Sequence, residues 1–232
     1  MSNELIWGRN SFNEALRANR VKEAYVLADS EYIGKLKKQH IPFSIKKRYE
    51  LDKMTKGENH QGIIGVIEGY ELSTVNSMIK EQNGLIVVLD GLEDPHNLGA
   101  IMRTVDCTGA DGIIYRRHHG VGLTPTVAKV SCGAIEYVKV AEVANLTQTL
   151  KDLKKRGYWV VGTDASAKQM YDELDYNMNV ALVIGSEGKG ISRLVLEECD
   201  FVVKLPMFGH VNSLNASVAS AVMLYEILEK RS

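Results

Sequence analysis

The chain has 232 residues, of which 45% are hydrophobic and 25% are charged, and its formal net charge at pH 7 is −1. These values are ordinary for a globular protein of one or two domains, and the net charge alone does not indicate a nucleic-acid binder. No run reaches the ~18 apolar residues of a membrane-spanning helix, and the N-terminus lacks the apolar stretch of a signal peptide. We therefore expect a soluble, cytoplasmic protein.

Charge is distributed unevenly along the chain. Residues 1–70 contain 12 Lys and Arg against 9 Asp and Glu, whereas residues 71–232 contain 16 against 20. The first part is therefore net positive and the second net negative. This difference predicts two domains with different partners.

Residues 1–72 are predicted to form a small α/β domain. Ser11 and Glu14 have the spacing of a capping box, which predicts a helix over residues 11–19. Strand and helix signals then alternate, with strands expected at residues 23–28, 42–45 and 63–67 and helices at residues 29–39 and 50–56. Residues 73–84 carry few strong signals and are the expected linker.

Residues 85–232 are predicted to form a second α/β domain. The segment LIVVLD, residues 85–90, is apolar up to its last residue, as in a parallel strand buried on both faces. Further strands are expected at residues 112–115, 159–162, 180–184 and 201–204, with helices at residues 96–108, 145–156 and 192–198. This alternation predicts an open parallel sheet with helices on both faces. Because ligand sites in such sheets lie beyond the carboxyl ends of the strands, we consider three polar segments that follow Asp90, Ile184 and Leu205.

The first segment is DGLEDPHNLGAIMRT, residues 90–104. Asp94 can cap a helix and Pro95 can occupy its first position. The apolar stripe of this helix is formed by Leu98, Ile101, Met102 and Val105. Arg103 lies about 150° from the centre of that stripe. From this segment alone, an Arg on a solvated face is a simpler interpretation than a cation aimed at a ligand.

The second segment is LVIGSEGKGIS, residues 182–192. Clustered glycines after a strand indicate close approach of the backbone to a ligand. The spacing matches neither a Walker A loop nor the dinucleotide pattern G-x-G-x-x-G. Glu187 in the middle would also repel a phosphate. The segment is therefore suited to a neutral or cationic ligand, although an ordinary strand-to-helix turn is an equal interpretation of the spacing.

The third segment is LPMFGHVNSLNASVASAVMLYE, residues 205–226, whose second half is a helix without a polar face. Asn212 or Ser213 could cap this helix. One cap does not explain why Asn212, Ser213, Asn215 and Ser217 all lie at a helix end that we expect to be buried. An unpaired buried polar group costs ~1–3 kcal/mol. A bound polar ligand, or a neighbouring backbone threaded alongside, would supply the partners.

In this order the three segments resemble the three motifs of the SpoU (TrmH) family of RNA ribose methyltransferases, within the knotted SPOUT superfamily. The resemblance extends from about Leu85 to the C-terminus, and three motifs at fitting separations are specific. The preceding basic domain resembles the ribosomal-protein-like RNA substrate-binding domain of RlmB-type and thiostrepton-resistance-type members. Residues 116–134 are also similar to the RlmB-type branch, which modifies a guanosine ribose of 23S rRNA.

The resemblance implies a fold, a cofactor, partners and site residues. It implies a trefoil knot in the parallel sheet, S-adenosylmethionine bound in the knot, and a homodimer formed through the knotted domain, which would cover the second side of the last helix. By motif position, it assigns functional roles to Asn97, Arg103, Glu187, Ser213 and Asn215 and cofactor binding to Gly185, Leu205, Met207 and Leu214.

The activity implied by the resemblance is methylation of a ribose 2′-hydroxyl in RNA, at a guanosine of 23S rRNA. A transfer RNA substrate remains an alternative, as does a non-catalytic RNA-binding protein that kept the fold. The two failed glycine patterns disfavour a third class, a phosphate-binding nucleotide enzyme.

Cations cluster between Tyr32 and Tyr49, a stretch without Asp or Glu. We call these six residues the basic cluster: Lys35, Lys37, Lys38, Lys46, Lys47 and Arg48. The group at Lys35–Lys38 alone would be a solubilising helix face. The second group so close by favours contact with RNA phosphates.

The sequence predicts neither a structural metal nor a disulfide framework. His118 and His119 are adjacent, so they point in different directions, and no Cys/His spacing resembles a zinc site. The three cysteines, Cys107, Cys132 and Cys199, are odd in number and far apart, which is typical of a reducing compartment.

Overall fold

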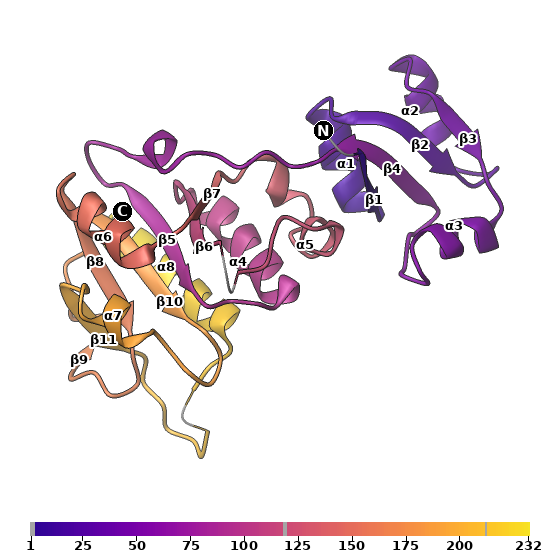
Figure 1. Cartoon of the computed structure of the whole chain (residues 1–232). Coiled ribbons are helices and arrows are strands. Elements are labelled where there is room, and N and C mark those ends of the chain that lie inside the picture. Colours follow the sequence, from indigo (N-terminus) through magenta and orange to yellow (C-terminus); the bar gives the residue numbers. More distant parts are fainter. Residues whose placement is uncertain (1–2, 118–119, 212) are drawn as a thin grey trace. The chain divides into compact units, whose positions relative to one another are not determined.

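The computed structural model of the chain describes residues 3–117, 120–211 and 213–232, and it divides into two compact units (Figure 1). The first unit contains the described residues up to Glu71 together with Leu123–Tyr137. The second contains Leu72–Gly122 and Val138–Ser232. Each unit combines helices with its own sheet, and the larger sheet is parallel, which confirms the predicted fold class.

The first unit is built on a four-stranded sheet in the order β1-β4-β2-β3. Its strands are β1 (Asn3–Trp7), β2 (Val21–Val26), β3 (Phe43–Ile45) and β4 (Ile63–Glu68). β4 pairs antiparallel with β1 and β2, and β2 pairs parallel with β3. The helices of this unit are α1 (Arg9–Arg17), α2 (Tyr32–Lys38), α3 (Arg48–Met54), α5 (Pro125–Val130) and the 3-10 turn η2 (Ala134–Glu136).

Two features of the first unit differ from the prediction. α1 begins at Arg9, with Gly8 as its N-cap, so the capping box expected at Ser11 does not form. Ser11 is instead buried, and its hydroxyl donates to the carbonyl oxygen of Ala128 at 2.9 Å. β1 was not expected, because its partner strand β4 lies far along the chain and such pairing leaves no local signal.

Residues 123–137 pack as part of the first unit, although they lie between two strands of the second. The Tyr70 hydroxyl donates to Glu136 at 2.9 Å, and the Arg20 guanidinium lies 4.5 Å from the centre of the Tyr70 ring. Arg20 Nε is 3.3 Å from the other Glu136 oxygen. Burial, followed by the charge of Glu136, raises the pKa of Tyr70, so the hydroxyl stays a donor. This placement had not been predicted from the sequence.

The second unit is built on a seven-stranded sheet in the order β7-β6-β5-β10-β8-β11-β9, in which every pair of neighbours is parallel. Its strands are β5 (Leu85–Asp90), β6 (Gly112–Arg116), β7 (Val140–Val143), β8 (Tyr158–Thr163), β9 (Gln169–Met170), β10 (Asn179–Gly185) and β11 (Phe201–Lys204). The five strands that the sequence predicted are present, and the short strands β7 and β9 were missed.

Helices cover both faces of this sheet (Figure 1). They are η1 (Val75–Met78), α4 (Pro95–Thr108), α6 (Leu146–Lys154), α7 (Arg193–Leu196) and α8 (Ala216–Lys230). α6 and α7 bury Leu150 and Val195 against alternate strand residues such as Ile86 and Val88, whereas α4 packs against α8. None of the helices in the described residues is both long enough and apolar enough to cross a membrane.

Residues 73–84, the expected linker, belong to the second unit. Met78 of η1 is 1% exposed and packs in the same apolar cluster as α6. The Tyr158 hydroxyl accepts a hydrogen bond from the Lys80 backbone at 3.0 Å, and the Asn179 side chain accepts one from the Gly84 backbone at 2.7 Å. These contacts hold the segment against the sheet.

Candidate functional site

The two central strands bring the first and second segments together. β5 and β10 are parallel neighbours, and their register pairs Gly185 with Asp90. The two segments therefore leave the sheet side by side at its carboxyl edge. Asp90, which is 5% exposed, accepts a hydrogen bond from the Ser192 backbone at 2.7 Å and so ties the end of the second segment to the start of the first.

Helix α4 places Asn97 at this edge. The Asp94 side chain caps the helix by accepting from the His96 backbone at 2.9 Å, and Pro95 follows the cap, as predicted. The predicted apolar stripe is buried against the sheet and α8: Leu98, Ile101, Met102 and Val105. Asn97 is itself 5% exposed, so its amide needs partners within the protein.

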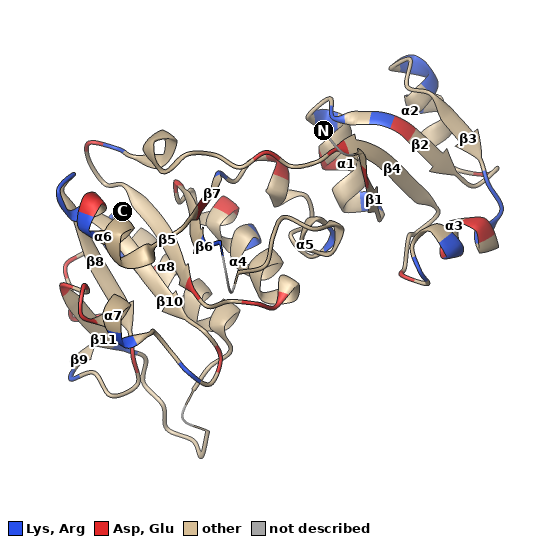
Figure 2. Ribbon diagram, viewed as in Figure 1, with Lys and Arg blue, Asp and Glu red and all other residues tan. Residues whose placement is uncertain are grey.

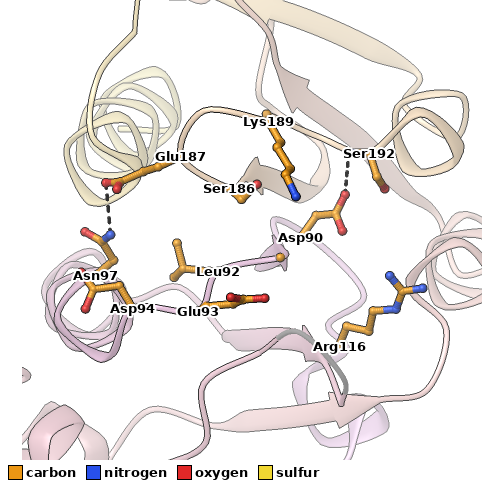
Figure 3. A pocket seen from close by; sticks show the side chains of 12 residues that line it. Asp90, Leu92, Glu93, Asp94, Asn97, Arg116, Ser186, Glu187, Lys189 and Ser192 are labelled. Atoms are coloured by element: carbon orange, nitrogen blue, oxygen red, sulfur yellow. Dashed lines mark hydrogen bonds between the residues drawn. The ribbon is translucent and has the colours of Figure 1, made fainter.

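One hydrogen-bond network joins all three segments. Asn97 Nδ2 donates to Glu187 Oε1 at 3.2 Å (Figure 3). Asn215 Nδ2 donates to Asn97 Oδ1 at 2.9 Å and also to Glu187 Oε1. We call this the Asn97–Glu187–Asn215 network. The network confirms that the glycine turn of the second segment (residues 185–190) and the start of the last helix, which are far apart in the sequence, meet in space.

The cap of α8 is Asn215 and not Ser213. Asn215 Oδ1 accepts from the backbones of Ser217 at 2.9 Å and Val218 at 3.3 Å. Asn215 thus uses its oxygen for the cap and its amide nitrogen for the network. Asn212, the other expected cap, lies outside the described residues.

The glycines of the second segment allow a tight turn. Ser186 and Gly190 exchange two backbone hydrogen bonds, of 3.1 and 2.9 Å. Gly188 and Gly190 have φ angles of 81° and 66°, which favour glycine. At Gly185 the reason is space, since a Cβ there would lie 2.1 Å from the carbonyl carbon of Gly190. The turn therefore closes directly over the end of β10.

A cavity of about 400 Å³, which we call the first cavity, lies between the second and third segments. All four residues predicted to bind a cofactor line it: Gly185, Leu205, Met207 and Leu214. Ser213 and Glu187 line it too, and Asp164 contributes a further carboxylate. The lining of the first cavity therefore combines apolar side chains, carboxylates and the backbone at Gly185.

A cavity of about 580 Å³, the second cavity, lies between the first and second segments. Asp90, Asn97 and Arg116 line it, together with residues of the turn (Figure 3). Four residues of the turn line both cavities: Ser186, Glu187, Lys189 and Gly190. The turn is therefore a shared wall, and Arg116 and Lys189 are lining residues that the sequence had not singled out. Their positions next to strand ends were the available signal.

Arg103 is not brought to either cavity. It is exposed on α4, and it is absent from both sets of lining residues in the part of the chain that the structure describes. Its catalytic role stays a prediction. The histidines His118 and His119 lie outside the described residues.

The basic cluster lies on α2 and around the start of α3 in the first unit (Figure 2). Lys46 is 3.8 Å from Glu50, and Lys35 lies 5.2 Å from the centre of the Tyr32 ring. The other four members make no ion pair among the described residues. Tyr49 beside them is 66% exposed. Cations and an aromatic ring are thus exposed in this unit, on α2 and at the start of α3.

Both parts of the chain match models of known families. Residues 84–225 match the SpoU rRNA Methylase family, and residues 5–73 match the model described as RNA 2′-O ribose methyltransferase substrate binding. YacO of Bacillus subtilis (strain 168), which is assigned to the TrmH family of tRNA/rRNA methyltransferases, is 46% identical over 241 residues. That match covers 99% of this chain and 96% of the relative.

Solved structures have the same fold. The SpoU methyltransferase AviRb from Streptomyces viridochromogenes, in complex with the cofactor AdoMet, has a TM-score of 0.86 at 23% identity, covering 99% of this chain and 90% of the other. A structure described as an RNA 2′-O ribose methyltransferase has a TM-score of 0.79 at 27% identity, covering 99% of this chain and 89% of the other.

Proposed function

This chain belongs to the SpoU rRNA methylase family of RNA 2′-O-ribose methyltransferases, and we propose that it methylates a guanosine ribose of 23S rRNA. The observation that carries the methyl transfer is the Asn97–Glu187–Asn215 network, which assembles the three family segments around two adjoining cavities. The choice of a guanosine of 23S rRNA rests on the resemblance of residues 116–134 to the RlmB-type branch. A methyl transfer between two substrates needs such a meeting point, because the reacting atoms must be held about 3–3.5 Å apart.

S-adenosylmethionine fits the first cavity. Leu205, Met207 and Leu214 offer apolar surface, and Gly185 lets the backbone approach closely. Glu187 and Asp164 carry two negative charges against the one positive charge of Lys189 in the same lining, so the lining is net negative, which suits a sulfonium. When bound, S-adenosylmethionine supplies an activated methyl group with a neutral leaving group, so no metal is needed for the transfer.

We propose that Glu187 accepts the proton of the 2′-hydroxyl. Its Oε1 is engaged by the two amides, whereas its Oε2 accepts no hydrogen bond among the described residues. The amides of Asn97 and Asn215 fix the carboxylate in position on the wall shared by both cavities. General-base catalysis of this kind contributes about 10²–10⁴-fold to a rate. From Glu187 the proton would leave to water.

We propose that Arg103 acts through the positive charge of its guanidinium and not as a base. A guanidinium stays protonated in proteins, so it is a poor base, but it can stabilise a developing negative charge or bind a phosphate. Substituting Arg103→Ala should abolish turnover and leave cofactor binding nearly intact. Loss of cofactor binding would show a structural role.

RNA is proposed to contact the first unit through the basic cluster. The substrate-binding family match covers residues 5–73, which contain the whole cluster. The exposed ring of Tyr49 can stack on a base. A ribosomal RNA substrate would place the protein in the cytoplasm. A transfer RNA substrate is the alternative, since the similar relatives are assigned as tRNA/rRNA methyltransferases.

We further propose a homodimer through the second unit. α8 buries Met223, Leu224 and Ile227 against its own unit. Its opposite side exposes four apolar residues: Val218, Val222, Tyr225 and Leu228. An apolar surface of this kind favours binding of a second copy of the chain. The trefoil knot stays a prediction from the family.

Two experiments test the proposed function. Calorimetry with S-adenosylmethionine and ATP should show binding of the first ligand alone, and binding of neither would refute the cofactor assignment. Mapping of 2′-O-methyl sites in total RNA from cells with and without the gene should show one guanosine of 23S rRNA that loses its methyl group. Loss from a transfer RNA instead would identify the alternative substrate.

A further inference from the structure

Arg231, just past the end of α8, joins this helix to the two central strands at the edge of the sheet opposite the site. Its guanidinium donates to four backbone carbonyl oxygens. Before β10, Nε bonds to Tyr176 at 2.9 Å and Nη2 bonds to Met178. Before β5, Nη1 bonds to Asn83 at 2.9 Å and Nη2 bonds to Gly84 at 3.2 Å. One side chain therefore holds the amino ends of the two strands whose carboxyl ends carry the site.

The chemistry of this contact requires an arginine. All four acceptors are uncharged carbonyl oxygens, and Arg231 forms no ion pair with the residues that the structure describes. The planar guanidinium presents donors in several directions at once, whereas the ammonium of a lysine is a point charge on a flexible stem. We therefore expect a lysine at this position to bind one strand end and to release the other.

The two halves of α8 are held unequally. The C-terminal half buries three large side chains: Met223, Leu224 and Ile227. Within this helix, which the structure describes throughout, the N-terminal half buries only Ala216 and Ser220, and these offer little apolar surface for packing. Asn215 caps the N-terminus, about 22 Å from the other end of this 15-residue helix. Its position is therefore set largely from the end that Arg231 holds.

Building on the proposed function, we propose that Arg231 is a positioning residue for methyl transfer. It fixes α8 along the sheet, and through the helix it holds the Asn215 amide against Glu187. A helix transmits a shift from one end to the other because its backbone hydrogen bonds fix the rise per residue. A displacement of about 1 Å, caused by a change far from the reacting atoms, can slow an enzyme about 100-fold.

Two variants change Arg231, and two others serve as controls. Arg231→Ala removes all four hydrogen bonds, and Arg231→Lys keeps the charge without the planar fork. Lys230→Ala is the matched control, since the neighbouring Lys230 ammonium lies 3.8 Å from Glu226 on the surface of the same helix. Leu150→Ala removes a fully buried side chain from the apolar cluster around α6 and α7, so it lowers the stability of the same unit at a different place.

Three measurements are made on each protein: the melting temperature, hydrogen exchange by NMR, and kcat at saturating cofactor and RNA. The informative amides are those of Ser217 and Val218, which donate to Asn215 Oδ1. In Arg231→Ala these amides should exchange roughly fivefold faster, as for a weakened helix cap, and kcat should fall about 10- to 100-fold.

The other variants have distinct expected results. Arg231→Lys should lie between Arg231→Ala and the wild type, and Lys230→Ala should behave as the wild type. Leu150→Ala should have a lower melting temperature, yet it should keep the kcat of the wild type and the exchange rates of Ser217 and Val218, because these amides exchange through local opening of the first turn.

Three results would overturn the assignment. The first is wild-type kcat and exchange in Arg231→Ala, and the second is an equal loss in Lys230→Ala. The third is a kcat in Leu150→Ala as low as in Arg231→Ala, because lost stability alone would then explain the effect. If Arg231→Ala does not fold, Arg231→Lys decides by the same measurements. If the wild type transfers no methyl group to any RNA, the proposed function fails, whereas hydrogen exchange still decides whether Arg231 holds Asn215 in place.

Discussion

Adding a single methyl group at Gly185 should damage both the stability and the cofactor site of the second unit. In Gly185→Ala the new Cβ would lie 2.1 Å from the carbonyl carbon of Gly190, 2.3 Å from the amide nitrogen of Ile191 and 2.5 Å from the Gly190 oxygen. All three neighbours are backbone atoms, so no change of side-chain rotamer can relieve the overlap.

The size of the effect follows from what must move. The turn would have to separate from the end of β10, which strains or breaks the two backbone hydrogen bonds between Ser186 and Gly190. Each contributes about 1 kcal/mol net, and overpacking adds about 1–3 kcal/mol. The free energy of unfolding should therefore fall by roughly 3–5 kcal/mol. For a chain of this size that lowers the melting temperature by roughly 6–20 °C.

Thermal denaturation and calorimetry with S-adenosylmethionine measure the two consequences. The cofactor should bind more than tenfold more weakly to Gly185→Ala, because the turn forms a wall of the first cavity. Gly209→Ala is the matched control in the third segment, since a Cβ there meets nothing within 4 Å, and its stability should change by less than about 0.5 kcal/mol. Equal melting temperatures and equal affinities for the two variants would refute this reasoning.

Three further predictions concern other parts of the chain. Asn215→Asp keeps an oxygen to cap α8 but places a second carboxylate beside Glu187; methyl transfer should fall at least about 10-fold with unchanged circular dichroism, and full activity would show that the network is dispensable. Reversing the charges of the basic cluster should weaken RNA binding and flatten its salt dependence by roughly 0.7 per lost contact; an unchanged slope would exclude this surface. Burial, followed by the charge of Asp200, raises the pKa of Cys199 to about 12, so its thiol stays neutral at pH 8 and iodoacetamide should modify the exposed Cys107 first; mass spectrometry showing early labelling of Cys199 in folded protein would contradict this.

The sequence predicted the central strands because their signal is local. The apolar run from Leu85 to Asp90 needs no partner to be read, and the same holds for residues 180–184. The cap at Asp94 was predicted because its side chain bonds to the first turn of the helix that follows, whereas the cap of α8 was expected at Asn212 or Ser213 and is Asn215. The short strands β7 and β9 lack a long apolar run, and β1 depends on a distant partner, so these three were missed.

The candidate site was predicted in its parts but not in its connections. Asn97, Glu187 and Asn215 were each named from the motifs, yet the hydrogen bonds that join them span 90 and 118 positions of the chain. Those bonds depend on the parallel register of β5 and β10, which no local pattern encodes. The second cavity was missed for the same reason, because Arg116 at the end of β6 and Lys189 after β10 line one cavity only through the order of the strands, in which β5 lies between β6 and β10.

The placement of residues 123–137 matters for anyone who wishes to exchange the RNA-binding part between relatives. The backbone passes between the two units at residues 71–72, 122–123 and 137–138, so a single cut after the N-terminal domain leaves one piece of the first unit behind. A transplanted domain without that piece would lose the partners of Ser11, Tyr70 and Arg20. A working chimera therefore has to be spliced at all three crossings.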